Sequence, residues 1–336
     1  MKTLFDILKT VFLCLGAVIG ANFISGSELL VFFGTQNFAI TILISAFCFL
    51  ISINLVFSVA VSSDFLRANK LMFSKSNLFN GVSVLCNFVL FVSMLAGIDS
   101  LSKQLNLFNG YAVLSIVSLV LVACFSKFGI SGLEKLNLFL MPCVLIIVNF
   151  LVFKSQSYIP IEFKFVAFTD GVKALLYCAL NTFISLPVLF ATAKGKSKLS
   201  LKVSSIIISM IIFIQAVLIL AVVCNNDSQN SFSPLLSALS KQGASVILIT
   251  CFFLCSLTSL SSSFYPVYEC ISARYGSIGI VIVCFLAFIF SRLGVSVIIT
   301  FVYPVIGAFG LVYLIKLYLL KRKEKVYFKG CIKGVK

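Results

Sequence analysis

Few residues in this chain have side chains that could catalyse a reaction. The 336 residues include no His and only 10 Asp and Glu residues. Without His, the chain lacks the His-containing zinc motifs and the Ser-His-Asp triad. The sequence also has no G-x-x-x-x-G-K-S/T motif, which would bind nucleotide phosphates. We therefore predict that the protein is not an enzyme and that it carries no cofactor.

The first long apolar segment is interrupted by residues that weaken a helix. Its middle reads GAVIGANFISGSE, with three glycines, an Asn and two serines. Gly, Asn and Ser favour non-helical backbone, and unwound backbone persists in a bilayer only where it lines a cavity or is buried in protein. The alternative is that Gly16 and Gly20 form a G-x-x-x-G pair for close helix packing. The candidate substrate-binding residues of this segment are Gly20, Ala21, Asn22, Phe23, Ser25, Gly26 and Glu28.

A second interruption is predicted in the apolar segment 166–193. Pro187 removes a backbone donor there and clashes with the preceding turn. Phe-Ile-Ser occurs at both interruptions, at residues 23–25 and 183–185. Paired broken segments at corresponding positions of two halves indicate a transporter binding site, and the alternative is two unrelated kinks. The candidate substrate-binding residues here are Asn181, Thr182, Phe183 and Ser185.

Glu28 has two interpretations that are compatible with each other. Ser25 and Glu28 fit an S-x-x-E capping box, in which Glu28 would reach back to Ser25 at the start of a half-helix. A carboxyl group at membrane depth is costly, however, and such groups commonly have a function. The sequence leaves open whether Glu28 caps the helix, couples transport to an ion or proton, or does both.

The composition places these interruptions in a membrane. Hydrophobic residues make up 61% of the chain and charged residues 11%, and the mean hydropathy is +1.16. A transmembrane helix needs about 20 mostly apolar residues. The sequence contains ten such runs, at residues 7–33, 38–61, 79–101, 107–126, 134–153, 166–193, 199–224, 243–270, 277–292 and 295–320.

The basic residues set the predicted orientation, because Lys and Arg accumulate in cytoplasmic loops. With ten spans and both termini inside, 20 of the 26 Lys and Arg residues lie on the cytoplasmic side and 6 lie outside. We predict a multi-pass protein of the cell (inner) membrane with both termini cytoplasmic. The expected partners are a small-molecule solute and the lipid bilayer. Nucleic acid is not an expected partner, because the basic residues lie between apolar runs, and no oligomeric state is predicted.

The run of residues 16–34 resembles the first-helix signature of the YkvI-like membrane protein family. That signature is G-x-x-I-G-A-G-F-A-S-G-x-E followed by an aromatic pair. Asn22 and Ile24 depart from it, because the family has Gly and Ala at these two positions. The matching residues are Gly16, Ile19, Gly20, Ala21, Phe23, Ser25, Gly26, Glu28, Phe32 and Phe33.

The YkvI-like family is similar to the amino acid–polyamine–organocation (LeuT-type) transporter superfamily. The resemblance implies an all-α polytopic membrane protein of about ten transmembrane helices, in a LeuT-like five-plus-five inverted repeat with helices 1 and 6 broken. The single transmembrane domain, 1–336, would contain a first five-helix repeat (1–154), a second repeat (155–320) and a basic cytoplasmic tail (321–336).

The function implied is a secondary active transporter that moves a small solute, an amino acid or related amine, by ion-coupled alternating access. The alternative is a non-transporting membrane sensor or assembly factor built on the same fold. The coupling ion would be Na+ or H+.

In LeuT-type transporters, hydroxyls on helix 8 and carbonyls beside the helix 1 break can hold a sodium ion, a hard cation suited to oxygen ligands. Segment 256–263 of this chain has six hydroxyl residues among eight. The alternative is that these hydroxyls bond to the backbone of their own helix or join neighbouring helices. The candidate sodium ligands are Thr258, Ser259 and Ser262.

Overall fold

All regular secondary structure in the described residues is helical, as expected where apolar segments must satisfy their own backbone hydrogen bonds within a bilayer. The computed structural model describes residues 2–34, 38–73, 76–104, 113–155, 167–226, 234–240, 245–293 and 298–333. The helices are α1 (Lys2–Val18), α2 (Ala21–Ser25), α3 (Ser27–Phe33), α4 (Phe38–Ala60), α5 (Phe65–Met72), α6 (Ser76–Gln104), α7 (Val113–Ser126), α8 (Gly129–Lys154), α9 (Phe168–Ala193), α10 (Lys198–Asn225), α11 (Pro234–Ser240), α12 (Ser245–Phe290), η2 (Ser291–Leu293), η3 (Ile298–Val302) and α14 (Tyr303–Lys333).

Within the described ranges, seven of these helices are long and apolar enough to cross a membrane. One of the seven, α12, has two arms that meet at Gly276, where a φ of 61° interrupts the helical backbone. Helix α7 is a shorter apolar helix, and α1, α2 and α3 follow one another as an interrupted segment. With the arms of α12 counted separately, these elements are compatible with the ten predicted spans.

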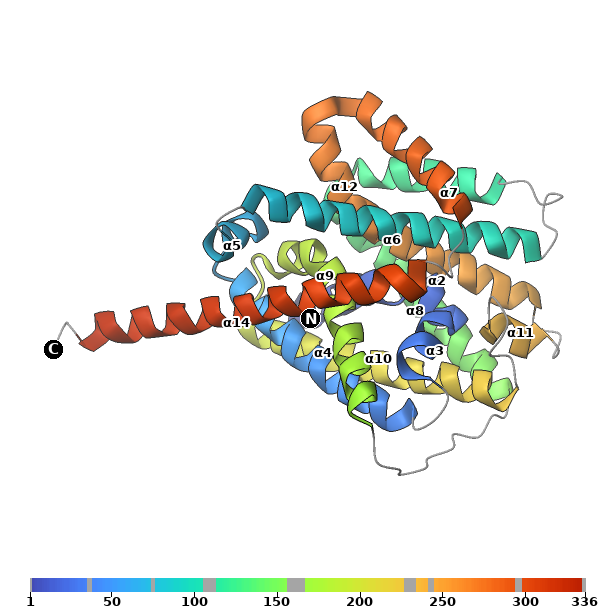
Figure 1. Cartoon of the computed structure of the whole chain (residues 1–336), viewed down its shortest axis with the longest axis horizontal. Helices are drawn as coiled ribbons and strands as arrows, with labels where there is room; N and C mark the ends of the chain where they lie inside the picture. Colours follow the sequence, from blue (N-terminus) through green and yellow to red (C-terminus); the bar gives the residue numbers. More distant parts are fainter. Residues whose placement is uncertain are drawn as a thin grey trace.

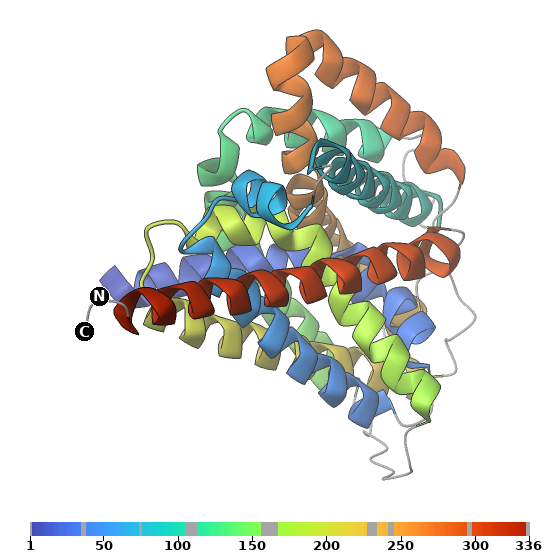
Figure 2. The ribbon, with the colours of Figure 1, turned by 60° about the vertical axis from the view of Figure 1, so that its left-hand side comes forward.

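The long helices pack in two groups, and α1 lies between them (Figures 1 and 2). In one group α4 packs against α9 and α10, and α1 contacts α9 and α10. In the other group α12 packs along α6, α7 and α8. Because α1 also contacts α8 and α12, its interruption is positioned where both groups meet.

Helix α14 packs closely along α9. A Cβ atom at Gly307 would lie 2.8 Å from the carbonyl oxygen of Leu176, and one at Gly310 would overlap the carbonyl oxygen of Ala179. Small residues at such positions let transmembrane helices approach each other through their backbones. The two glycines therefore set the short separation between α14 and α9.

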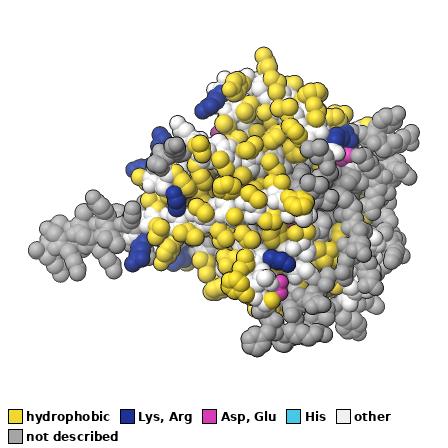
Figure 3. All heavy atoms as spheres, in the orientation of Figure 1, with side chains coloured by type: hydrophobic (Ala, Val, Ile, Leu, Met, Phe, Trp, Pro, Cys, Tyr) yellow, Lys and Arg dark blue, Asp and Glu magenta, His cyan; other side chains and the backbone are white. Residues whose placement is uncertain are grey.

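Much of the outer surface consists of large apolar side chains. Phe139 is 72% exposed and Phe153 is 86% exposed. Soluble proteins rarely expose contiguous apolar patches larger than a few hundred Å². Figure 3 shows a mainly apolar face, on which most of the visible Lys and Arg side chains lie toward the end where the C-terminus lies in Figure 1, and a few lie at the right and lower edges. This distribution is that of a protein surrounded by lipid.

Candidate functional site

The first span is broken, as the sequence predicts. The backbone at Gly20 is extended, with φ −103° and ψ −178°, and Gly26 has a φ of 81°. Residues other than Gly rarely adopt a positive φ such as that of Gly26. Between the two glycines, α2 forms little more than one turn, which begins at Ala21 and buries Phe23. The break therefore consists of two non-helical glycines that flank a short helical turn.

The span containing α9 is not broken, contrary to the prediction. Helix α9 is continuous and contains Pro187. Pro removes one backbone donor, but a transmembrane helix tolerates this where neighbouring helices and hydroxyl side chains satisfy the freed groups. Packing against both α4 and α14 holds α9 in place. The four predicted residues of this segment are side chains of a continuous helix: Asn181, Thr182, Phe183 and Ser185.

The predicted capping box at Ser25 and Glu28 does not form. The N-cap of α3 is Gly26 and not Ser25. The left-handed backbone of Gly26 makes this residue both the C-cap of α2 and the N-cap of α3. The Ser25 hydroxyl donates to the Asn22 carbonyl at 2.8 Å and accepts the backbone N–H of Ser27 at 3.1 Å. Ser25 therefore closes the α2–α3 corner without a contribution from Glu28.

Glu28 instead points toward α9. Its side chain is only 3% exposed, and Asn181 Nδ2 donates to its Oε1 at 3.3 Å. The side chain of Tyr177, one turn before Asn181 on α9, lies near the same carboxyl group. No Lys or Arg among the described residues forms an ion pair with Glu28. The result is a buried carboxyl group that has one amide partner.

Aromatic rings enclose Tyr177 beside this carboxyl group. The centroids of Phe32, Phe33 and Phe49 lie 5.2, 4.8 and 5.9 Å from the centroid of the Tyr177 ring. Aromatic faces carry negative potential and attract cations. These three rings hold Tyr177 in place, and a buried carboxyl group with one amide partner suits a positively charged group. Sequence reasoning missed Tyr177, although its i, i+4 spacing from Asn181 is a signal that could have found it.

Asn22 joins three elements that are far apart in the sequence. Its Nδ2 donates to Ser93 Oγ of α6 and to Tyr303 Oη of α14, both at 3.1 Å. Tyr303 Oη also donates to Ser93 Oγ at 3.1 Å. All three side chains are buried. Neither partner was predicted: Ser93 has no distinguishing sequence context, whereas Tyr303 is marked by Pro304, which follows it.

Ser259 of α12 contacts the end of α1. Its hydroxyl lies 3.1 Å from the carbonyl oxygens of both Gly16 and Ile19, and the Cys255 thiol donates to the Ile19 carbonyl at 3.1 Å. The last carbonyls of a helix lack partners within the helix, so α12 supplies them. Gly20 favours this approach, because a Cβ atom there would lie only 2.9 Å from the Met94 methyl carbon and 3.0 Å from Ser259 Oγ.

The hydroxyls of the other two candidate sodium ligands bond to their own helix. The Thr258 hydroxyl donates to the Cys255 carbonyl at 2.8 Å, and the Ser262 hydroxyl donates to the Thr258 carbonyl at 2.9 Å. Both are bonds to the backbone of α12 itself. The oxygen atoms that the structure brings together at this point are the Ser259 hydroxyl and the carbonyl oxygens of Gly16, in α1, and Ile19, just after it.

The remaining predicted residues of α9 face different neighbours. The hydroxyls of Thr182 and Ser52 of α4 are 3.0 Å apart. The Phe183 ring packs against Tyr313 of α14 with centroids 5.9 Å apart. Ser185 is buried, and its hydroxyl has no hydrogen-bond partner in the part of the chain that the structure describes. Of the four, only Asn181 is directly bonded to a predicted residue of the first span.

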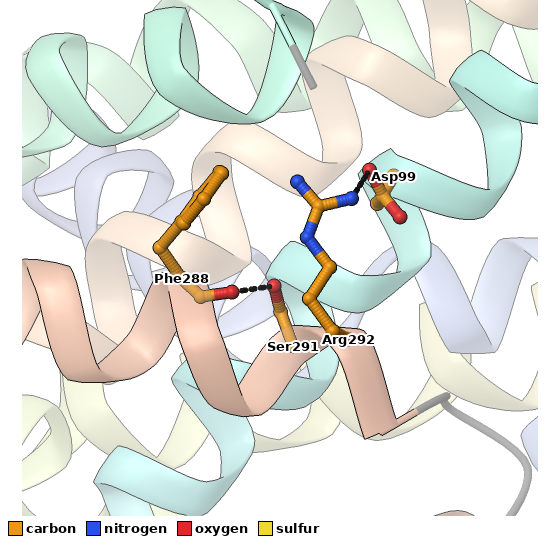
Figure 4. Close-up of polar contacts among 4 residues, drawn as sticks. All are labelled: Asp99, Phe288, Ser291 and Arg292. Atoms are coloured by element: carbon orange, nitrogen blue, oxygen red, sulfur yellow. Dashed lines mark hydrogen bonds and ion pairs between the residues drawn. The ribbon is translucent and has the colours of Figure 1, made fainter. Parts of the chain in front are cut away.

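An ion pair away from the centre joins α6 to η2 (Figure 4). Arg292 Nη1 lies 2.7 Å from Asp99 Oδ1, and the Asp99 side chain is 5% exposed. The Arg292 guanidinium also lies 4.6 Å from the centroid of the Phe288 ring. The Ser291 hydroxyl donates to the Phe288 carbonyl at 2.8 Å. The Arg292–Asp99 ion pair fastens the end of α12 to α6, and the two contacts with Phe288 are local to that end.

Comparison with known proteins identifies relatives only at the level of structure, since no family model and no curated protein matches the sequence. A variant of a manganese transporter from Eremococcus coleocola has a TM-score of 0.63 at 12% identity, over 94% of this chain and 78% of the transporter. The same transporter bound to an aromatic bis-isothiourea compound gives 0.60 at 14% identity, over 93% and 76%. Mhp1, a nucleobase-cation-symport-1 family transporter in a closed conformation with bromovinylhydantoin bound, gives 0.62 at 10% identity, over 87% and 73%.

These similarities establish the fold. The chain is an all-α polytopic membrane protein with a LeuT-like fold, and its helix count is compatible with that of this fold. Identities of 10–14% show the fold alone. The resemblance to the YkvI-like family stays a prediction, because no family model matches.

Proposed function

We propose that this protein is a secondary active transporter that moves a small solute bearing a positively charged amine, by ion-coupled alternating access. An amino acid or a related amine is the proposed substrate class. The observation that carries the proposal is Glu28, a buried carboxyl group beside the break in the first span. Broken helices in transporter folds typically border the substrate site near the bilayer midplane. Membership of the YkvI-like family is part of the proposal and is supported by the signature in residues 16–34.

The surroundings of Glu28 favour an ammonium group as its partner. An unpaired carboxylate in a low-dielectric interior is costly, and pairing with a hydrogen-bonding cation offsets the cost. Asn181 supplies one donor, whereas an ammonium group has three. A substrate carboxylate, where present, would have to face away from Glu28.

For the coupling ion we propose Na+, with H+ carried by Glu28 as the alternative. The carbonyl oxygens of Gly16 and Ile19 each lie 3.1 Å from the hydroxyl oxygen of Ser259. Such neutral oxygen ligands suit a hard cation. Thr258 and Ser262 would join them if their hydroxyls turned away from the α12 backbone.

The proposed location is the cell (inner) membrane with both termini in the cytoplasm. The 20-to-6 distribution of Lys and Arg supports this orientation. Reporter fusions at Lys70, Lys196 and Lys336 should then report the cytoplasm, and fusions near Asn106 and Asn230 should report the outside. A C-terminal reporter on the outside would overturn both the orientation and the count of ten spans.

The function is tested by combining ligand stabilisation with transport. Purified protein would be screened for thermal stabilisation by a panel of amino acids, amines, neutral solutes and anions, and the active solutes would then be tested for uptake into proteoliposomes. We expect amine-bearing solutes to stabilise the protein and to accumulate only when a sodium or proton gradient is applied. Stabilisation without uptake under any gradient would favour the sensor alternative, and uptake of only neutral or anionic solutes would contradict the assignment of Glu28.

A further inference from the structure

A groove lies between α4 and α14, away from the proposed substrate site. Its cavity volume is about 480 Å³. The α4 side of the groove is formed mainly by Leu50, Ile51 and Leu55, and Ile51 is exposed at the outer surface. Helix α14 passes across α4 to form the other side (Figures 1 and 2). The apolar wall has the character of a surface that contacts acyl chains.

Four polar residues also line this groove. Lys321 and Arg322 of α14 line it together with Tyr318, and no acidic residue lines it. Asn54 projects into it from α4 and is half-buried, and its side chain has no hydrogen-bond partner among the described residues. An amide without a partner at the lipid-facing surface of a transmembrane helix is costly. A polar ligand that formed hydrogen bonds to the Asn54 amide would offset this cost.

We propose that the groove is a binding site for one anionic phospholipid. The lipid phosphate would contact Lys321 and Arg322, since Arg presents a fork of donors that matches phosphate oxygens. The Asn54 amide would bond to the phosphate or to the ester linkage next to it. One acyl chain would lie along Leu50 and Ile51. This inference goes beyond transport and does not depend on the identity of the substrate.

The proposed orientation places this groove in the leaflet that contains anionic lipids. The proposed orientation places Lys321 and Arg322 at the cytoplasmic end of α14, and the cytoplasmic leaflet carries the negative surface potential of anionic lipids. Basic residues at helix ends also interact diffusely with any anionic bilayer surface. The proposed site differs from that general effect because it combines two cations with a cavity and an amide at one place.

The absence of Trp from the chain provides a direct assay. Tyr318→Trp places a single fluorophore on the groove, and Ile206→Trp places one on the exposed surface of α10, outside the groove. Each full-length variant would be reconstituted in bilayers that contain either brominated phosphatidylglycerol or brominated phosphatidylcholine. Quenching by the two brominated lipids gives the relative affinity of each location for anionic over zwitterionic lipid.

We expect the Tyr318→Trp reporter to prefer phosphatidylglycerol by on the order of tenfold, below the roughly thirty-fold that two fully effective cations would give. The Ile206→Trp reporter should show a clearly smaller ratio, because the exposed Lys202 one turn before it attracts anionic lipid only diffusely. In the Tyr318→Trp background, the double substitution Lys321→Ala and Arg322→Ala should abolish the preference. The matched control, Lys198→Ala with Lys202→Ala, removes two exposed cations from α10 and should leave the preference unchanged.

Asn54→Leu provides a second variant that keeps both charges and so guards against a folding defect in the double variant. It should weaken quenching of the Tyr318→Trp reporter by both brominated lipids, because phosphatidylglycerol and phosphatidylcholine share the phosphate and ester linkages that Asn54 would contact. Equal lipid ratios at the two reporters would overturn the proposal. So would equal losses from the Lys321/Arg322 and Lys198/Lys202 variants, because both results would describe diffuse attraction of lipid to a basic surface.

Discussion

Replacing Glu28 with Gln removes the charge of the buried carboxyl group while preserving its shape. The Gln side-chain oxygen can still accept the hydrogen bond that Asn181 donates to Glu28 Oε1 at 3.3 Å. A neutral amide also avoids the cost of desolvating a carboxylate at a position that is 3% exposed. The thermal stability of Glu28→Gln should therefore equal or exceed that of the wild-type protein in the absence of solute.

Transport should respond in the opposite direction. Removing one partner of a buried, hydrogen-bonded charge pair costs about 2–5 kcal/mol. Even the lower value corresponds to a loss of about thirty-fold in the efficiency of amine uptake, at about 1.4 kcal/mol for each factor of ten. Stabilisation by amines should weaken to a similar degree, because the same contact determines binding.

The assay is gradient-driven uptake at matched protein density, scanned over pH. Glu269→Gln is the control, because it also removes one carboxylate but at an exposed position of α12. We expect the control to transport normally and Glu28→Gln to lose uptake while remaining folded. Full, pH-dependent uptake by Glu28→Gln would refute the reasoning and leave Glu28 as a structural residue.

Three further substitutions test other parts of the structure. Ser259→Ala removes the hydroxyl donor of the Gly16 carbonyl, while the Ile19 carbonyl keeps the Cys255 thiol. We expect a loss of about 1–3 kcal/mol in unfolding free energy and the loss of stabilisation by sodium; retained sodium stabilisation would exclude the proposed sodium ligand. Gly310→Ala places a methyl group against the Ala179 carbonyl, so the folded yield after purification should fall markedly, and a wild-type yield would contradict the close α14–α9 packing. Arg292→Gln removes the ion pair with Asp99 and should lower the unfolding free energy by roughly 1–3 kcal/mol, less than for a fully buried pair because Arg292 is 35% exposed. Adding Asp99→Asn should recover much of that stability in a thermal-unfolding measurement. No recovery would argue against the ion pair as the cause of the loss.

The sequence identifies the break in the first span because local chemistry causes it. Gly20 and Gly26 adopt backbone conformations that interrupt a helix, and the prediction rests on their number and position. Pro187 gives a weaker signal, because the effect of one missing donor depends on how α4 and α14 pack against α9. Neighbouring helices keep α9 continuous, and sequence alone does not specify those contacts.

The candidate site was predictable to a similar extent. Asn22 and Glu28 stand out as polar residues within an apolar segment, so their types alone mark them. Their partners depend on the rotation and pairing of helices that are distant in the sequence, as for Ser93 and Tyr303. The capping box failed for a related reason, since the left-handed backbone at Gly26 fixes where α3 begins.

The central claim is that an amine is transported through the break in the first span by coupling to an ion gradient. Its most direct test is uptake of radiolabelled amines and amino acids into proteoliposomes, with a sodium gradient, a proton gradient or neither, by wild-type and Glu28→Gln protein. We expect saturable uptake by the wild-type protein under one of the two gradients and its loss in the variant. Equal uptake by both proteins, or no uptake of any amine under either gradient, would contradict the claim.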